Sequence, residues 1–380
     1  MPAAGSGTGS GTGSKTGSGT AEWYRHFGSV DAPGSSPCYA DWSLHIADDP
    51  ELLARIDVWP YNKRQPLLML AAARFLGARV SPYTEFRRFL DEHWAEVSRT
   101  VMSRATQTNE VGRCATLLPS LGAIAAAEGR PLALIEVGAS AGLALFPDRY
   151  SYEFDDGVTV TRLGPGRSGE RRGRGGSGER RGRGGSGERR GGDGSDGLPE
   201  PPVLRCRTVG GVPLPDALPE VVWRAGIDLN PLDVRNPDDV AWLEALIWPE
   251  QEFRRERLRR AIAVAREHPP LLVAGDLNEQ LLSLAGQAPA DAALVVFHSA
   301  VMGYVSADGR ARFRASMQGL AHDRGCHWLS NEGETVIIQE DGSAVLPEMD
   351  PSRIRGNFLL QHNGQPVAIT GPHGQSLDWL

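Results

Sequence analysis

Two patterns of hydrophobic and polar residues divide this chain. In the first region apolar residues recur at helical spacing, as in 83–101, where Phe86 and Val97 fall on one side of the predicted helix. In the second region short apolar runs alternate with helical segments, which is typical of β-α units that build a mostly parallel sheet. The patterns predict a helical N-terminal subdomain over 22–130 and an α/β domain over 131–380.

The individual elements follow from the same patterns and from Pro, Gly and Asn positions. Helices are expected first at 51–58, 66–76, 83–101 and 109–127, and then, between the strands, at 237–246, 249–267, 278–285 and 310–323. Parallel strands are expected at 132–137, 221–229, 271–275, 293–298 and 326–330. The chain then turns to strands at 335–339, 358–362 and 365–370, of which the last two flank Asn363-Gly364, a strong hairpin signal.

Two segments lack the apolar residues that folding requires. Residues 1–21 are almost entirely Gly, Ser and Thr, without the apolar core of a signal peptide, and are expected to form a disordered tail. Within 168–190 the sequence SGERRGRGG occurs twice and is followed by SGERRGG, so a disordered Arg-Gly-rich insertion is expected at about 164–198. Such an arm is able to bind nucleic acid, but each repeat carries a Glu and no aromatic residue, which favours a solvated loop.

Charge and cysteine content narrow the class of protein. The formal net charge of −7 disfavours nucleic acid as a partner. The four cysteines are scattered without a C-x-x-C pair, which suits a reducing cytoplasm and predicts no metal site. No stretch approaches the roughly 20 apolar residues of a membrane-spanning helix. We therefore expect a cytoplasmic protein without a membrane segment.

The most informative segment is the apolar run 132–137 and the small-residue loop that follows it. The run contains Glu136 near its end and continues as Gly138-Ala139-Ser140-Ala141-Gly142, a pattern typical of a buried strand that turns into a helix N-terminus. Free N–H groups at such a turn favour negative or polar ligand atoms. The loop fits a cofactor pocket, and because it also reads G-x-S-x-G, it fits the nucleophile elbow of a hydrolase.

The hydrolase interpretation makes Ser140 the nucleophile. An Asp and a His must then follow in chain order, and Asp276 or Asp291 followed by one of several histidines satisfies that order; these are His298, His327, His362 and His373. No upstream His-Gly-Gly run offers an oxyanion loop. Glu136 also stands where a hydrolase strand is usually apolar, and a buried carboxylate without a partner is costly.

The cofactor interpretation gives this acid and three later strand ends a role. The second predicted strand ends in Asp228, the third is followed by Asp276, and the fourth ends in His298-Ser299. Carboxyl ends of parallel strands open onto the ligand crevice of an α/β sheet. Three acidic strand ends and one His-Ser end are together a more specific signal than the loop alone.

With these residues, the region from Pro131 onward resembles the class I S-adenosylmethionine-dependent methyltransferases. The resemblance implies a Rossmann-like seven-stranded sheet that ends in an antiparallel hairpin. It also implies cofactor contacts, with the methionine part lined by Glu136, Gly138, Ser140 and Gly142, ribose bound by Asp228, and adenine contacted by Asp276 and Leu277.

The chain departs from the methyltransferase pattern in several places. Ser140 replaces a frequent second glycine, and Pro147 requires the first helix to be short or broken. The gap from Leu143 to Val221, between the first and second predicted strands, is unusually long even without the Arg-Gly-rich insertion. Asp155 and Asp156 lie nearer the usual spacing of about 20 residues for a ribose acid, although neither ends an apolar strand.

From about Ser36 to Leu380 the chain also resembles an uncharacterised bacterial family, a resemblance that implies no activity. It is carried by 107–113, 136–152, 226–233, 248–250 and 297–300.

The sequence thus favours methyl transfer from S-adenosylmethionine to an unidentified small molecule, with His298 as a candidate general base. A hydrogen-bonded structural role for His298 stays open. The alternatives are a serine hydrolase that uses Ser140 and a non-catalytic ligand-binding protein. The G-x-x-x-G loop disfavours NAD, whose fingerprint is G-x-G-x-x-G. The methyl acceptor and the oligomeric state are not indicated.

Overall fold

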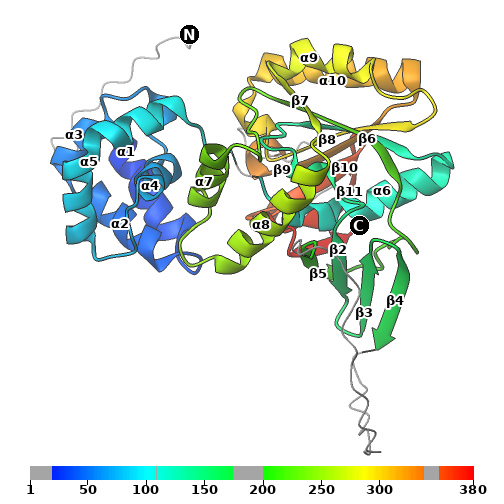
Figure 1. Cartoon of the computed structure of the whole chain (residues 1–380), viewed down its shortest axis with the longest axis horizontal. Coiled ribbons are helices and arrows are strands. Elements are labelled where there is room, and N and C mark those ends of the chain that lie inside the picture. The colour runs from blue at the N-terminus through cyan, green and yellow to red at the C-terminus, as the bar shows by residue number, and fades with distance from the viewer. Residues whose placement is uncertain (1–18, 108, 174–199, 338–350) are drawn as a thin grey trace, which may run out of the picture. The chain divides into compact units, whose positions relative to one another are not determined.

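The computed structural model describes residues 19–107, 109–173, 200–337 and 351–380, and the chain divides into two compact units (Figure 1). The first, here the helical unit, comprises residues up to Thr106 together with Ala245–Glu252. The second, here the sheet unit, comprises Gln107–Glu244 and Phe253–Leu380. The helix predicted at 109–127 therefore belongs to the sheet unit.

The helical unit is built from five α-helices in its described N-terminal part, and the helices predicted at 51–58, 66–76 and 83–101 are all present. They are α1 (Gly19–His26), α2 (Pro37–Ala47), α3 (Pro50–Ile56), α4 (Pro66–Phe75) and α5 (Tyr83–Ser103), with short turns of helix at Phe27–Asp31 and Tyr61–Lys63. Helix α1 begins inside the segment predicted to be a tail, and residues 1–18 of that segment lie outside the described residues.

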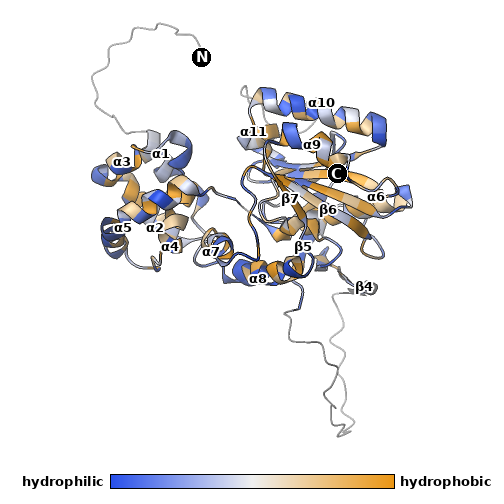
Figure 2. Cartoon of the chain, turned by 45° about the horizontal axis from the view of Figure 1, so that its top comes forward, coloured by the Kyte–Doolittle hydropathy of each residue, from blue (hydrophilic) through white to orange (hydrophobic). Residues whose placement is uncertain are grey.

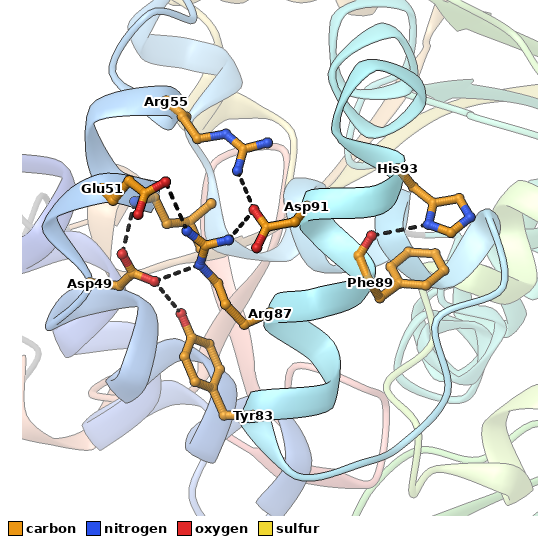
Figure 3. A network of polar contacts seen from close by, with 9 residues as sticks. Asp49, Glu51, Arg55, Tyr83, Arg87, Phe89, Asp91 and His93 are labelled. Carbon is orange, nitrogen blue, oxygen red and sulfur yellow. Dashed lines mark hydrogen bonds and ion pairs between the residues drawn. The ribbon is translucent and has the colours of Figure 1, made fainter.

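An ion-pair network fixes α5 against α3 (Figure 3). Asp49 caps α3 by accepting a hydrogen bond from the Leu52 N–H at 2.9 Å. The second oxygen of Asp49 accepts from Arg87 Nε at 2.7 Å and from the Tyr83 hydroxyl at 3.0 Å. Because these groups satisfy one another, we assign the network a structural role.

A segment distant in sequence completes the core of the helical unit. The ring of Trp248 lies 5.5 Å from that of Phe27 and 5.9 Å from that of Tyr39. Two residues later, the Glu250 carboxylate accepts from the Ser36 hydroxyl at 2.5 Å and from the Cys38 N–H at 2.9 Å. Residues 245–252 are therefore part of this core, although they follow the sheet unit's α7 (Pro237–Ala245).

The described residues of the sheet unit form one mixed sheet of twelve strands, in place of the seven expected. Its order is β4-β3-β2-β5-β12-β11-β10-β9-β8-β1-β6-β7. The strands are β1 (Leu132–Val137), β2 (Ser151–Asp155), β3 (Thr159–Gly164), β4 (Arg167–Gly173), β5 (Val203–Val209), β6 (Val221–Asp228), β7 (Leu271–Ala274), β8 (Ala293–Ser299), β9 (His327–Gly333), β10 (Phe358–His362), β11 (Gln365–Thr370) and β12 (Ser376–Trp379). The α-helices are α6 (Cys114–Glu128), α7, α8 (Glu252–Glu267), α9 (Leu277–Ala285), α10 (Ala307–Arg324) and α11 (Glu334–Ile337).

Five neighbouring strands, β7-β6-β1-β8-β9, are parallel and form the part of the sheet that positions the candidate site. Numbered along the chain, their order is 3-2-1-4-5, as in doubly wound α/β folds. The chain leaves β1 toward β6 on one side and later adds β8 on the other. The switch point of this topology therefore lies at the carboxyl ends of β1 and β8.

Helices cover both faces of the parallel strands. On one face Ile135, Val137 and Val296 pack with apolar residues of α9 and α10, and Figure 1 shows these two helices side by side. The opposite face is contacted by α6. Figure 2 shows that the strands are largely hydrophobic, whereas α8 and α10 carry many hydrophilic residues. This layering is the reason why β1 is buried along its whole length.

At the antiparallel end of the sheet the predicted hairpin is confirmed, whereas the strand predicted from residue 335 is not present among the described residues. Strands β10 and β11 pair around Asn363-Gly364, and Asn363 has the positive φ of 51° that such turns need. The strand predicted at 335–339 is wrong for its described part, because α11 occupies Glu334–Ile337. Ile337 there packs with Ile354, Leu359 and Ile369, so local tertiary packing overrides β-propensity.

The first crossover also differs from the expected helix. After the glycine loop the chain forms only one 3-10 turn, Leu143–Leu145, consistent with the break predicted at Pro147. It continues into a β-ribbon of β2, β3 and β4, so the predicted insertion is paired strand as far as Gly173. Its remaining part, 174–198, lies outside the described residues.

Candidate ligand site at the carboxyl edge of the parallel strands

Strand alternation divides the predicted site residues between the two faces of the sheet. Glu136 lies opposite Gly226 and Phe297 in the register, so Glu136 and Asp228 share one face. Val137 lies opposite His298, which places His298 on the other face with α10. The structure therefore brings Glu136 and Asp228 together and separates them from His298.

Glu136 is a buried carboxylate without a hydrogen-bond partner for one of its oxygens. The residue is 9% exposed, and Oε2 finds no partner among the described residues. Burial and the neighbouring charge of Asp228 raise the pKa of Glu136 well above its usual value, and Arg113 offsets this only in part. An unsatisfied buried carboxylate is energetically unfavourable, which makes it a candidate receptor for a donor or cation from a ligand.

Asp228 holds the glycine loop closed. Its Oδ2 accepts a hydrogen bond from the Ser140 N–H at 2.8 Å, and its Oδ1 accepts from the Asn230 N–H at 2.8 Å. The loop is also held by its own backbone, because Gly138 and Ala139 both donate to the Ile227 carbonyl. The end of β6 therefore fixes the conformation of the loop that follows β1.

The two glycines of the loop are required for conformation and packing. Gly138 and Gly142 have φ of 72° and 69°, values that favour glycine. A Cβ on Gly138 would lie 2.4 Å from Val301 Cγ2, and one on Gly142 would lie 2.9 Å from Pro270 Cγ. Side chains of the protein already fill the space next to both glycines.

Ser140 has the one feature expected of a nucleophile elbow, a positive φ of 51°. Its Oγ is buried and has no hydrogen-bond partner among the described residues. The four candidate histidines bond other groups: His298 contacts Glu332, His327 contacts Glu128, His362 contacts His327, and His373 contacts Glu110. None of these four histidines is therefore placed as a general base for Ser140 in the part of the chain that the structure describes.

Asp276 and Leu277 lie beyond the carboxyl end of β7, as predicted, at the start of α9. The exposed Asp276 carboxylate caps this helix by accepting from the Asn278 N–H at 2.8 Å. Leu277 packs against the apolar core of the sheet. Neither contact brings these residues to Glu136.

His298 is a fully hydrogen-bonded histidine, 1% exposed. Its Nδ1 lies 2.6 Å from Glu332 Oε1, and its Nε2 accepts from the Trp328 indole N–H at 3.0 Å. Because an indole only donates, Nδ1 carries the proton and both ring nitrogens are occupied. This geometry corresponds to the hydrogen-bonded role that the sequence left open.

The segment 107–113, which the sequence left without a firm role, lies over the glycine loop. The Gln107 side chain donates to Asp228 Oδ1 at 3.1 Å, and Asn109 Nδ2 donates to the Ala139 carbonyl at 3.1 Å. Arg113 donates to the Ser299 carbonyl at 3.0 Å and to the Pro372 carbonyl at 2.9 Å. The sequence signals here were the density of amide and charged side chains and the resemblance of 107–113 to the uncharacterised bacterial family.

Glu110 anchors this segment through buried ion pairs. Its carboxylate lies 2.7 Å from Arg254 and 2.6 Å from Arg257, both on α8, and 3.2 Å from His373. Burial disfavours the charged form, but the two arginines outweigh it and hold the pKa of Glu110 well below its usual range. Part of the arginine-rich helix is therefore a buried structural contact.

Three further observations concern metal ions, membranes and nucleic acid as partners. Among the described residues no group of three His, Cys, Asp or Glu side chains is placed to bind a metal ion. No helix in the described part of the chain has the length and hydropathy needed to cross a bilayer. On the ribbon, Glu153 lies 3.0 Å from Arg162 and 3.5 Å from Arg205, so acidic and basic side chains neutralise one another there.

The fold and site together define a mixed α/β protein in which a buried carboxylate beside the switch point of the parallel strands has one oxygen without a hydrogen-bond partner among the described residues. The chain belongs to a family described as uncharacterized protein conserved in bacteria (DUF2332), whose model matches residues 21–379. No curated protein and no solved structure gives a significant match.

Proposed function

We propose that this protein binds S-adenosylmethionine at the carboxyl edge of β1 and β6 and transfers its methyl group to a small molecule. The observation that carries the proposal is Glu136, whose buried carboxylate at this edge has an oxygen that no described residue contacts by a hydrogen bond. The 3-2-1-4-5 order of the parallel strands adds support, because doubly wound sheets bind their ligands outside the carboxyl ends of the strands at the switch point.

The residues present fit this cofactor at some positions and constrain it at others. A buried carboxylate suits the ammonium group of the methionine part, since an ion pair would satisfy the free oxygen. Asp228 is placed to accept from ribose hydroxyls, although three N–H groups already donate to it. Val301 and Pro270 close the space beside the glycines, so the ligand contacts side chains here more than the glycine backbone.

Each residue of the site then has a defined task. When bound, S-adenosylmethionine supplies an electrophilic methyl group on a sulfonium ion. Glu136 would hold the cationic end of the ligand, and Asp228 would hold its sugar while it keeps the loop in place. The protein would act mainly by orientation, which contributes several kcal/mol in well-aligned transfers, roughly 7–11 at best. With both nitrogens bonded, we assign His298 a supporting role.

The experiment is a calorimetric titration of the full chain with S-adenosylmethionine and with S-adenosylhomocysteine. We expect micromolar binding of both, weakened at least tenfold in Asp228→Asn and unchanged in a matched control, Glu153→Gln, on β2 of the ribbon. Absence of binding to either ligand would overturn the proposal. Binding without methyl transfer to any acceptor would favour the non-catalytic alternative.

A serine hydrolase stays the second candidate because of one observation, the positive φ of Ser140. A fluorophosphonate probe that labels the wild-type chain but not Ser140→Ala would establish it. We expect no labelling, because Ser140 Oγ is buried and lacks a base among the described residues.

A further inference from the structure

The side-chain amide of Gln107 occupies a position on Asp228 that a ligand hydroxyl would use. Gln107 Nε2 donates to Asp228 Oδ1 at 3.1 Å and to the Asn230 carbonyl at 2.6 Å. We propose that Gln107 is an internal competitor at this site, which leaves Asp228 when a hydroxyl-bearing ligand binds and thereby sets its affinity. This inference rests on the proposed function, because it assumes that a sugar binds at Asp228.

The hydrogen bonds of Asp228 show which donor is replaceable. A carboxylate offers about four acceptor positions. Three are used, by the Ser140 N–H, the Asn230 N–H and the Gln107 amide. The first two donors are backbone groups fixed by the loops that follow β1 and β6. Gln107 is the side-chain donor and is only partly buried, so rotation about its side-chain bonds is enough to release it.

A vicinal diol needs the position that Gln107 takes. Two adjacent hydroxyls donate best to both oxygens of one carboxylate, and Asp228 has one unused position besides the one that Gln107 fills. One hydroxyl can therefore bind without displacement, whereas a pair of hydroxyls must replace the amide. The competition is specific for ligands that carry both hydroxyls.

The neighbourhood of Gln107 allows it to move without unfolding the segment. Asn230 Nδ2 lies 3.4 Å from Gln107 Oε1, so contacts to Asn230 are able to hold the displaced side chain. Asn109 is anchored separately on the Ala139 carbonyl, and Glu110 is fixed by Arg254 and Arg257. Residues 109–113 therefore keep their contacts when the Gln107 amide leaves Asp228.

The test compares adenosine with 2′,3′-dideoxyadenosine, and uses S-adenosylmethionine as the main probe. Gln107→Ala and Gln107→Met are titrated beside the wild-type chain; Met keeps the approximate length of the side chain without its amide. We expect both variants to bind S-adenosylmethionine and adenosine about tenfold more tightly, since each loses a hydrogen bond that competes with the ligand. The affinity for 2′,3′-dideoxyadenosine is expected to stay the same.

The control is Gln287→Ala, which removes an exposed amide that bonds the Ser283 carbonyl on α9. The inference would be overturned if both Gln107 variants bind adenosine no more tightly than the wild-type chain. The proposed function would then still stand, provided that the wild-type chain binds adenosine and Asp228→Asn abolishes this binding. An equal gain for the dideoxy ligand would show that Gln107 acts by bulk alone and would also overturn it. Absence of binding in every protein would overturn the proposed function together with this inference.

Discussion

At the scale of single residues, two buried carboxylates of the sheet unit have opposite surroundings. Glu332 accepts from His298 and from the N–H groups of Val301 and Met302, so its charge is satisfied. Glu136 has an oxygen without a hydrogen-bond partner in the described part of the chain, and it faces the charge of Asp228. Natural proteins retain such an unfavourable group mainly where it serves a ligand or a reaction.

The pH dependence of stability is the first consequence. Because the pKa of folded Glu136 lies above its ordinary value of 4.5, the folded chain keeps a proton that the unfolded chain loses. Glu136 therefore makes the folded chain less stable as the pH rises from about 4.5 through the pKa that Glu136 has in the folded chain. We expect Glu136→Gln to raise the free energy of unfolding by about 1–3 kcal/mol near pH 8, and by less toward pH 5. Urea unfolding at several pH values measures this, and an effect that is independent of pH would contradict it.

The second consequence concerns His298. Its replacement by alanine leaves the Trp328 indole without its acceptor and Glu332 without one donor, so we expect a loss of about 1–3 kcal/mol in stability. Affinity for S-adenosylmethionine should change less than about twofold. Chemical denaturation and calorimetry of His298→Ala check both values. Lost methyl transfer in a variant of unchanged stability would show instead that His298 is the base.

At the scale of elements, the sequence predicted those whose pattern is local. Strands β1, β10 and β11 have the predicted bounds, because continuous apolar runs and Asn-Gly mark their ends. Strand β5 was missed although its buried and exposed residues alternate strictly, because Arg205 and Arg207 at two exposed positions interrupt its apolar run. Helix α11 was mistaken for a strand because the packing of Ile337 is set by residues distant in sequence.

In the candidate site, too, residues marked by a local pattern were predicted and residues placed by long-range contacts were not. Strand ends could be predicted, so Glu136 and Asp228 were found from the sequence. Gln107 and Asn109 were not assigned to the loop, because their contacts join residues 30 to 123 positions apart in the sequence and no local pattern encodes them. The face on which His298 lies depends on sheet register, which the sequence leaves unspecified.

Glu110 supplies the prediction at this scale. Its removal leaves the side chains of Arg254 and Arg257, which are 10% and 16% exposed, without their carboxylate. We expect Glu110→Ala to cost about 3–5 kcal/mol. Glu244→Ala, whose partner Arg259 is 48% exposed, should cost at most about 1 kcal/mol. Equal losses in guanidinium unfolding would contradict the assignment. Because folding lowers the pKa of Glu110, its contribution to stability is present above the pKa that Glu110 has in the unfolded chain. This contribution is lost as the pH falls through the pKa of the folded chain.

At the scale of the whole molecule, the chain crosses between its two units more than once. Residues 245–252 return to the helical unit after β1 and β6, the first two of the five neighbouring parallel strands, and Trp248 and Glu250 join its core. A boundary drawn from local patterns at residue 130 misses this crossing, because hydrophobic periodicity carries no information on which core a segment joins.

At this scale we predict that replacing Trp248 reduces hydrogen-exchange protection in the helical unit but not in the sheet unit. Trp248→Ala removes ring contacts with Phe27 and Tyr39, for which we expect a cost of about 2–4 kcal/mol within the helical unit. Hydrogen exchange should accelerate in α2 and α4 while β1 and β8 keep their protection. Uniform acceleration in both units would show instead that they unfold as one.

The central claim is that the free oxygen of Glu136 exists to bind a cationic ligand, and thermal unfolding of the wild-type chain and Glu136→Gln with and without S-adenosylmethionine tests it most directly. The account predicts that Glu136→Gln unfolds at a higher temperature than the wild-type chain near neutral pH, and that the ligand stabilises only the wild-type chain. Equal stabilisation of both proteins by the ligand, or of neither, would contradict it.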